Sequence, residues 1–208
     1  MTHRDYYFSD AIEGTAQVIA CVAVDGLWSV ELNRTLFHPQ GGGQLADTGW
    51  INDLPVLGVE AQGERIHHLV EQALPLGEVQ LKIDVQARLL HERLHTAGHL
   101  IGYVGQQNGL RPTKAQHWPN ASRVVFELND NAPPKLAELQ SAVQALLAQN
   151  LNRLSQEKDG LRWIAFGDLP AFPCGGTHVR ELAELGQVSL LDMKCKKNLV
   201  TISYDVLA

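Results

Sequence analysis

The sequence predicts an α+β protein in which a small N-terminal β-barrel, residues 1–85, precedes an α+β domain, residues 86–208. Short β-branched and apolar runs, separated by Gly, Pro, Asn or Asp, occupy most of the first part of the chain. A helical apolar period begins after Asp84, and a second apolar stripe follows Pro134. This change of pattern places the expected domain boundary near residue 86.

The expected barrel strands begin with a hairpin. Residues 17–24 and 28–33 are joined by Asp25-Gly26, a dipeptide that favours tight hairpin turns. Four more runs of similar composition follow, at residues 48–52, 55–60, 65–71 and 78–85. Several short strands at such spacing are typical of a small barrel.

An amphipathic helix is expected over residues 85–107. Its apolar residues recur every three or four positions and comprise Leu90, Leu94, Ala97, Ile101 and Val104. Asn108-Gly109 is a typical helix end. One face of this helix should therefore be buried.

A second helix is expected to carry Pro133 or Pro134 in its first turn and to end at Asp159-Gly160. Its apolar stripe comprises Leu136, Leu139, Val143, Leu146, Leu147, Leu151 and Leu154. Strands are expected at residues 122–128 and 161–166. A C-terminal hairpin is expected from residues 188–194 and 199–204, with its turn at residues 196–198.

Composition narrows the class of protein. Apolar residues make up 45% of the 208 positions and charged residues 19%, so the chain can bury a sizeable core. There is no apolar run long enough for a membrane span, and the N-terminal residues lack the layout of a signal peptide, so the expected location is the cytoplasm.

The net charge of −6 is unusual for a nucleic-acid-binding protein. Local basic clusters nevertheless occur, comprising Lys194, Lys196 and Lys197; Arg111, Lys114 and Arg123; and Arg88 and Arg93. They form either one basic strip or ordinary solvated faces, and solvated faces are the more common case.

Two histidines in the first expected helix point to metal binding. His95 and His99, in the segment His-Thr-Ala-Gly-His, are four residues apart, so their imidazoles lie on one helix face and can bind one ion. Alone, such a pair is weak evidence, because His91 extends the same row and helices can carry histidines on a solvated face.

A distant segment, Pro-Cys-Gly-Gly-Thr-His, adds a thiol and a third imidazole. Cys174 and His178 flank Gly175 and Gly176, which indicate a loop in which both ligands can turn inward. Alternatively, Cys174 is a small packing residue beside a turn. The two segments together supply a four-ligand zinc set, so we expect one Zn²⁺ per chain. The other cysteines, Cys21 and Cys195, fall in expected strands and are interpreted as packing residues.

The residue beside the first histidine limits the chemistry. Zinc proteases carry a glutamate there as general base, and this chain has Thr96. Ester hydrolysis, which is easier than amide hydrolysis, fits such a site better. A zinc-bound water with a pKa of about 7 can attack an ester without a strong side-chain base.

A glycine-rich segment lies in the barrel domain. It does not match a phosphate-binding loop, because no Lys-Ser or Lys-Thr follows Gly41–Gly43. It is either an ordinary barrel loop or a place where the backbone approaches a ligand. Gln44 could then offer both a donor and an acceptor to a small polar substrate.

The ordered motifs resemble the free-standing alanyl-tRNA editing proteins of the AlaX type, in their medium-length form, and the editing domain of alanyl-tRNA synthetase. The matching residues are Thr35, Phe37, Pro39, Gly42, Gly43, Gln44, Asp47 and Gly49, then His95–Leu100, then Cys174–His178, and the likeness extends to the C-terminal hairpin. Two positions depart from the family pattern, with Leu94 where Asn is common and His38 where Tyr is common.

The resemblance implies a trans-acting, zinc-dependent deacylase. Its expected substrate is tRNA(Ala) mischarged with serine, with Gly-tRNA(Ala) as a second candidate, and no organic cofactor is implied. Carried over as zinc ligands are His95, His99, Cys174 and His178. Gln44 and Thr35 carry over as pocket residues, and the amides of Gly175 and Gly176 are candidates for stabilising an oxyanion.

Two other functions are compatible with the residues alone. One is a zinc-dependent hydrolase of a small aminoacyl ester or amide. The other is an RNA-binding module with a structural zinc, which would unfold on metal removal without any turnover to lose. A site closed by four protein ligands leaves open whether zinc activates water or only positions the substrate.

Overall fold

The computed structural model describes residues 1–128 and 132–207, and the chain forms two compact units. The first comprises Met1–Gly41 and Leu45–Leu89, and the second comprises Gly42–Gln44 and Leu90–Ala208. The glycine-rich residues Gly42–Gln44 thus pack with the second unit although they interrupt the first in sequence. Each unit has its own hydrophobic core.

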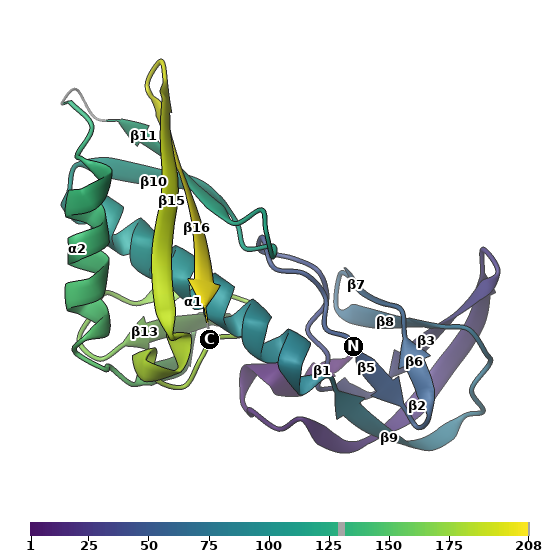
Figure 1. Cartoon of the computed structure of the whole chain (residues 1–208). Helices are drawn as coiled ribbons and strands as arrows, with labels where there is room; N and C mark the ends of the chain where they lie inside the picture. The colour runs from purple at the N-terminus through teal and green to yellow at the C-terminus, as the bar shows by residue number, and fades with distance from the viewer. Residues whose placement is uncertain (129–131, 208) are drawn as a thin grey trace. The chain divides into compact units, whose positions relative to one another are not determined.

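The first unit is a nearly closed antiparallel barrel of seven strands in the order β6-β5-β9-β2-β3-β8-β7 (Figure 1). These strands are β2 (Glu13–Val24), β3 (Leu27–Leu32), β5 (Gly49–Ile51), β6 (Leu54–Val56), β7 (Gly58–Gln62), β8 (Arg65–Val70) and β9 (Gly77–Ile83). A short parallel pair, β1 (His3–Arg4) with β4 (Arg34–Thr35), and a 3-10 helix, η1 (Asp5–Tyr7), complete the unit. The predicted barrel is confirmed in this nearly closed form.

The barrel closes at Leu57. The chain passes from one edge strand, β6, through this single residue to the opposite edge strand, β7, so the two edges meet. The backbone N–H of Leu57 donates to the carbonyl of Leu69 in β8, at 2.8 Å. The prediction of one strand over residues 55–60 was therefore wrong, because the chain changes edge in the middle of that run.

The predicted first hairpin is confirmed. Asp25 and Gly26 have φ angles of 49° and 83°, which match a type I′ turn between β2 and β3. Two-residue turns of this kind have the twist of the flanking strands, which explains why the dipeptide is a reliable signal.

The buried His68 side chain is hydrogen-bonded at both ring nitrogens inside the barrel. The His68 Nδ1–H donates to the carbonyl of Val30 (3.1 Å), so Nε2 is left to accept from the Thr35 hydroxyl (2.8 Å). Thr35 Oγ1 in turn accepts from the amide of Phe37 (3.0 Å). Desolvation by burial lowers the pKa of His68 to about 4.

Acid should destabilise the barrel through His68. An unfolded histidine titrates near about 6.5, so below that pH the unfolded chain binds a proton that folded His68 does not. The contribution of neutral His68 to the free energy of unfolding is fully present above about pH 6.5 and is reduced by about 3 kcal/mol at about pH 4. We expect urea unfolding midpoints to fall between pH 7 and pH 4, and to fall less in His68→Gln. A ring pKa near 6.5 by NMR would contradict this expectation.

The second unit holds most of helix α1 (Val85–Gln107), whose first residues belong to the first unit, together with helix α2 (Leu136–Leu147). A four-stranded sheet has the order β10-β11-β16-β15, and a three-stranded sheet has the order β12-β13-β14. Their strands are β10 (Leu110–Gln116), β11 (Arg123–Leu128), β12 (Arg153–Lys158), β13 (Leu161–Phe166), β14 (Phe172–Pro173), β15 (Gln187–Lys196) and β16 (Leu199–Leu207), with a 3-10 helix, η2 (Leu182–Leu185).

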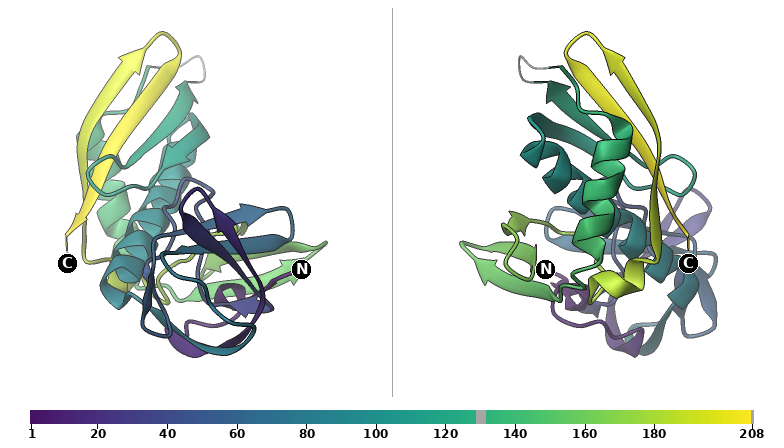
Figure 2. Two further views of the ribbon diagram at one scale, coloured as in Figure 1. Left: turned by 90° about the vertical axis from the view of Figure 1, so that its right-hand side faces the viewer. Right: turned by 60° about the vertical axis from the view of Figure 1, so that its left-hand side comes forward.

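Helix α2 lies alongside β15 (Figure 2). The side-chain amides of Gln140 and Gln144 both donate to the Val188 carbonyl, each at 3.0 Å. The apolar stripe of α2 joins α1 and the four-stranded sheet in the core of this unit. The expected span of α1 and the C-terminal hairpin are confirmed, with Lys197 in the left-handed region (φ 57°) at the turn.

The second helix is shorter than predicted. The prolines precede its N-cap, Lys135, and the helix ends at Leu147. Asn150, with φ 46°, ends the helical path, so Leu151 packs from a loop and Leu154 lies exposed in β12. Asp159 and Gly160 turn β12 into β13 rather than closing a helix. Strands β10 and β12 were not predicted.

Two further predictions were wrong. Cys195 is exposed in β15 rather than a packing residue, whereas Cys21 is partly buried against the barrel core. Arg88 belongs neither to a basic strip nor to a solvated face, the two alternatives for its cluster, because it is buried in an ion pair with Asp47. In the described part of the chain, we find no helix with the length and apolar character that a membrane crossing requires.

Candidate metal centre

Helix α1 presents two imidazoles to one point in the second unit. His95 and His99 lie one turn apart and their rings stack, with centroids 4.9 Å apart. His95 is buried and His99 is half-buried. The i, i+4 spacing thus produces the shared face that the sequence predicts.

The loop after β14 brings Cys174 and His178 to the same point. Cys174 Sγ lies 3.5 Å from His95 Nε2, 3.6 Å from His99 Nε2 and 3.2 Å from His178 Nε2. All four ligand atoms lie within 4.8 Å of one another. In a tetrahedral zinc site, bond lengths of about 2.3 Å to sulfur and about 2.1 Å to nitrogen place those atoms about 3.6 Å apart. The cluster therefore has the donor set and the spacing to hold one metal ion.

Gln44 orients one of these imidazoles. Its Oε1 lies 2.5 Å from His95 Nδ1 and also accepts from the amide of Thr177 at 3.1 Å. Its Nε2 donates to Thr177 Oγ1 at 2.9 Å. Because Gln44 Oε1 can only accept, His95 Nδ1 must carry the proton, and Nε2 keeps a lone pair for a metal.

Thr96 hydrogen-bonds a second imidazole of the cluster, that of His178. Its hydroxyl oxygen lies 3.1 Å from His178 Nδ1 and 3.3 Å from the amide nitrogen of Val179. In the sequence analysis, Thr96 is only evidence against a zinc protease. In the structure this buried residue completes the support of the second imidazole.

Arginines from β12 and β13 hold the ligand loop through its carbonyls. Arg162 Nη1 donates to the Gly176 carbonyl at 2.6 Å, and Arg153 Nη1 donates to the His178 carbonyl at 2.5 Å. The amide of Gly176 donates to Cys174 Sγ at 3.4 Å. The loop is therefore fixed before any ion is bound.

Burial sets the protonation state of the cluster. It lowers the pKa of His99 to about 3 and lowers that of His178 well below its ordinary value, so both imidazoles are neutral, as ligands must be. Burial also raises the pKa of the Cys174 thiol, against the opposing effect of the Gly176 amide. A thiolate here needs a cation beside it, which is what a metal ion supplies.

Comparison with known proteins identifies the family. No protein-family model matches the sequence. The chain is 30% identical to the alanyl-tRNA editing protein AlaX-M of Pyrococcus horikoshii over 197 residues, which cover 90% of this chain and 90% of that protein. The chain belongs to the alanyl-tRNA editing proteins.

Longer members of the alanyl-tRNA editing proteins are also similar. AlaX-L of Pyrococcus horikoshii is 27% identical over 98% of this chain and 58% of its own length. Aarsd1 of Rattus norvegicus is 31% identical over 95% of this chain and 56% of its own length. The chain thus spans about half the length of these longer curated relatives.

The structure brings some of the predicted site residues of this chain together. Gln44, Gly176 and the four candidate ligands meet in the second unit, and Gly175 is exposed beside them. Thr35 belongs to the barrel unit, where its hydroxyl is engaged with His68. Its role in a substrate pocket stays a prediction.

His117 was missed by the sequence analysis. Its ring stacks on His95 with centroids 4.4 Å apart, and its Nδ1 lies 2.6 Å from the Tyr204 hydroxyl, which donates to the Leu94 carbonyl. Burial lowers the pKa of His117 to about 4. His117 follows β10 and has no second histidine or cysteine at ligand spacing near it in the sequence. No sequence pattern therefore indicates its place beside His95.

The glycine-rich segment reaches this site through His117. The amide of His117 donates to the Gly43 carbonyl at 2.8 Å. Gly43 has φ +79°, and a Cβ there would lie 2.7 Å from the Ala115 carbonyl oxygen, so only glycine fits. This close approach places the next residue, Gln44, against His95.

Proposed function

We propose that this protein is a trans-editing hydrolase that removes serine from mischarged tRNA(Ala), with Gly-tRNA(Ala) as a second substrate, and so prevents mistranslation. Family membership supports the tRNA substrate. The observation that carries the hydrolytic part is the four-residue cluster of His95, His99, Cys174 and His178, all within 4.8 Å. Three imidazoles and one thiol form a donor set that favours zinc over magnesium or calcium.

When bound, zinc supplies a Lewis acid that polarises a carbonyl and lowers the pKa of a coordinated water. The chain's own residues prepare the site for this. Gln44 holds the proton of His95 on Nδ1, which leaves Nε2 free to bind a metal ion, and Thr96 contacts Nδ1 of His178, so that His178 Nε2 would be the ligand atom. The Gly176 amide stabilises the Cys174 thiolate, with N to Sγ 3.4 Å.

An oxyanion formed from the ester carbonyl needs a donor that is not already engaged. Of the two glycine amides considered for this role, the Gly176 amide already donates to Cys174 Sγ. We therefore assign the oxyanion interaction to the amide of Gly175, an exposed residue of the same loop.

The residue at the protease glutamate position supports an ester substrate. Thr96 has a hydroxyl that is engaged by His178 and Val179, so it cannot act as a general base for amide cleavage. An aminoacyl ester is more reactive than an amide, so its hydrolysis does not require a strong general base in the site.

Deacylation of Ser-tRNA(Ala) tests the proposal. We expect about one zinc per chain in the wild type and release of serine from Ser-tRNA(Ala). Cys174→Ala should lose both, because it removes a ligand, whereas Cys195→Ala, an exposed cysteine in the same unit, should lose neither. Equal deacylation by wild type and Cys174→Ala would refute the site.

The same experiment separates the two alternative functions. Equal rates on Ser-tRNA(Ala) and on a seryl ester of adenosine would favour a small-ester hydrolase. Metal-dependent folding without hydrolysis of any of these substrates would favour a structural zinc.

A further inference from the structure

The four-stranded sheet of the second unit has a covered face and an exposed face. On the covered face, Val124 of β11 and Ile202 of β16 are buried in the core with side chains of α1 and α2. Side chains alternate between the two faces of a strand. Val125 and Thr201, which are adjacent to them in sequence, therefore lie on the opposite face and are only partly buried. We call this opposite face the outer face.

The strand register brings two basic clusters of the sequence onto the outer face. Residues directly opposite each other in antiparallel strands point to the same side of the sheet. Two rows cross the four strands on this side, and they comprise Lys114, Val125, Thr201 and Lys194, and Arg111, Glu127, Leu199 and Lys196. Each row begins and ends on a basic side chain, although its two ends come from β10 and β15, which are far apart in the sequence.

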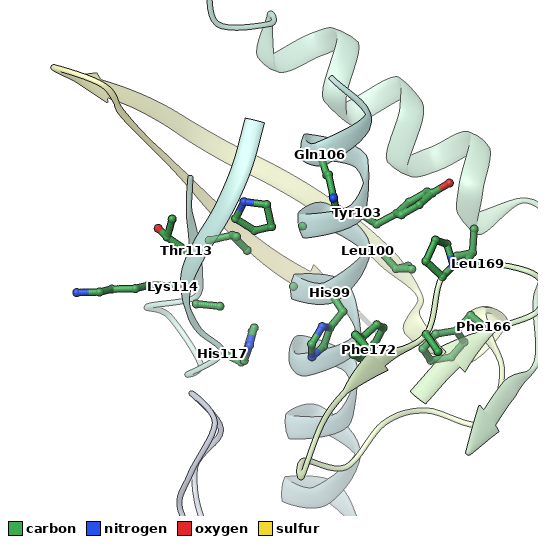
Figure 3. Close-up of a pocket in the computed structure, with 17 residues that line it drawn as sticks. His99, Leu100, Tyr103, Gln106, Thr113, Lys114, His117, Phe166, Leu169 and Phe172 are labelled. Atoms are coloured by element: carbon green, nitrogen blue, oxygen red, sulfur yellow. The ribbon is translucent and has the colours of Figure 1, made fainter. Parts of the chain in front are cut away.

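The direction of the Lys114 side chain agrees with this register. A pocket of about 390 Å³ shares His99 with the candidate metal centre, and Lys114 is one of the residues that border it (Figure 3). In that view the Lys114 side chain points away from His99 and from the helix that carries it. The ammonium group of Lys114 is therefore directed away from the pocket and is available on the outer face.

Positive charge is in excess on the outer face. The described strands carry five basic and three acidic side chains there, which are Arg111, Lys114, Arg123, Lys194 and Lys196, and Glu127, Asp192 and Asp205. The whole chain has the opposite balance, with 17 basic and 23 acidic residues. Lys114 and Lys196 are exposed and form no ion pair with any residue that the structure describes. Such a local excess of basic groups is typical of a surface that binds a polyanion.

The arrangement of these charges suits an RNA duplex. Neighbouring strands lie about 4.8 Å apart, so the basic side chains of the two edge strands, β10 and β15, are about 14 Å apart. Between Lys114 and Lys194, the row contains only the uncharged Val125 and Thr201. An A-form duplex has phosphates on both sides of a wide and shallow minor groove. Two basic edges with an uncharged row between them therefore match two phosphate strands across that groove.

We propose that the outer face of this sheet binds the phosphates of an RNA duplex, and that this duplex is a helical stem of the tRNA substrate. This inference rests on the proposed function. Helix α1, which carries His95 and His99, packs on the covered face, where the Tyr204 hydroxyl of β16 donates to the Leu94 carbonyl. The outer face is thus a contact separate from the metal centre.

Binding of an uncharged tRNA(Ala) transcript to the zinc-loaded protein tests this surface. Lys114→Gln with Lys196→Gln removes one unpaired charge from each edge of the sheet. Lys82→Gln with Lys158→Gln is the matched control, because both lysines are exposed and lie outside this sheet. By fluorescence anisotropy, the first double variant should raise Kd about tenfold and reduce the slope of log affinity against log salt concentration by about 2. The control should change neither quantity.

Equal affinity and equal salt slope in the wild type and in Lys114→Gln with Lys196→Gln, both folded by circular dichroism, would overturn the inference. An RNA duplex of unrelated sequence should show the same dependence on the two lysines, because phosphate contacts carry no sequence information. Two other occupants of the outer face would also contradict the proposal. They are phosphatidylserine vesicles that bind while the RNA duplex does not, and a second copy of this chain, detected as a dimer that the double variant dissociates in sedimentation.

Hydrolysis kinetics distinguish this inference from the proposed function. The double variant Lys114→Gln with Lys196→Gln should raise KM for Ser-tRNA(Ala) about tenfold and leave hydrolysis of the seryl ester of adenosine unchanged, since that ester has no helical stem. If the wild type cleaves Ser-tRNA(Ala) and the double variant matches its KM, the surface assignment fails while the function stands. If the wild type cleaves no ester but the double variant binds tRNA more weakly with a lower salt slope, the function fails and the surface stands.

Discussion

Replacing Gly176 with alanine is expected to lower metal affinity about 10- to 100-fold and to abolish the proposed deacylation. A Cβ at this position would overlap the His95 imidazole and would lie 2.8 Å from Gln44 Oε1. The loop cannot retreat easily, because Arg162 and Arg153 hold its carbonyls. His95 would therefore be displaced from the position at which its Nε2 faces Cys174.

Competition of the purified protein with a zinc chelator measures this effect. Gly102→Ala is the matched control, since it makes the same substitution in the same unit where the nearest atom is 4.0 Å away. It should keep wild-type metal affinity and gain up to about 1 kcal/mol of helix stability. Wild-type zinc affinity in Gly176→Ala would show that the contact between the loop and His95 is not needed.

Removing the charge of Asp47 is expected to destabilise the barrel unit by about 3–5 kcal/mol. The Asp47 carboxylate accepts from Arg88 Nε at 2.9 Å and from Arg88 Nη2, and it also accepts from the amide of His38 at 2.5 Å. Both side chains are buried. Asp47→Asn would leave the Arg88 guanidinium as an uncompensated charge in the interior.

Urea unfolding of Asp47→Asn measures this cost. Glu13→Gln is a matched control in the same unit, because its ion pair with Lys82 is exposed and such pairs contribute only about 0–1 kcal/mol. The double variant Asp47→Asn with Arg88→Met should recover part of the loss, since the unpaired charge is gone. A small loss in Asp47→Asn, equal to that in Glu13→Gln, would show that the buried pair does not stabilise the unit.

Much of the local structure could be predicted because short-range patterns decide it. The span of α1 follows from its apolar period and its Asn108-Gly109 end, and the β2–β3 turn follows from two residues that accept positive φ. The end of α2 could not be predicted in this way. The apolar period continues through Leu151 and Leu154, but the chain leaves the helix and pairs as β12.

The candidate ligands could also be predicted, because their residue types and i, i+4 spacings are present in the chain itself. The residues that support these ligands could not be predicted from the sequence. Gln44 was expected to be a pocket residue, which stays a prediction, and its contact with His95 had no signal in the sequence. Thr96, His117 and Arg162 have no distinguishing pattern, since each gains its role from a partner far away in the chain.

The amino-acid sequence by itself determined the span of α1, the first and last hairpins, the residue types of the candidate ligands and the family resemblance, because each depends on residue identity at short separations. Only the tertiary structure decided which atoms meet: the closure of the barrel at Leu57, the orientation of His95 by Gln44, and the pocket that shares His99. These features depend on packing between segments that are far apart in the sequence, and sequence order alone does not determine which of those segments come into contact.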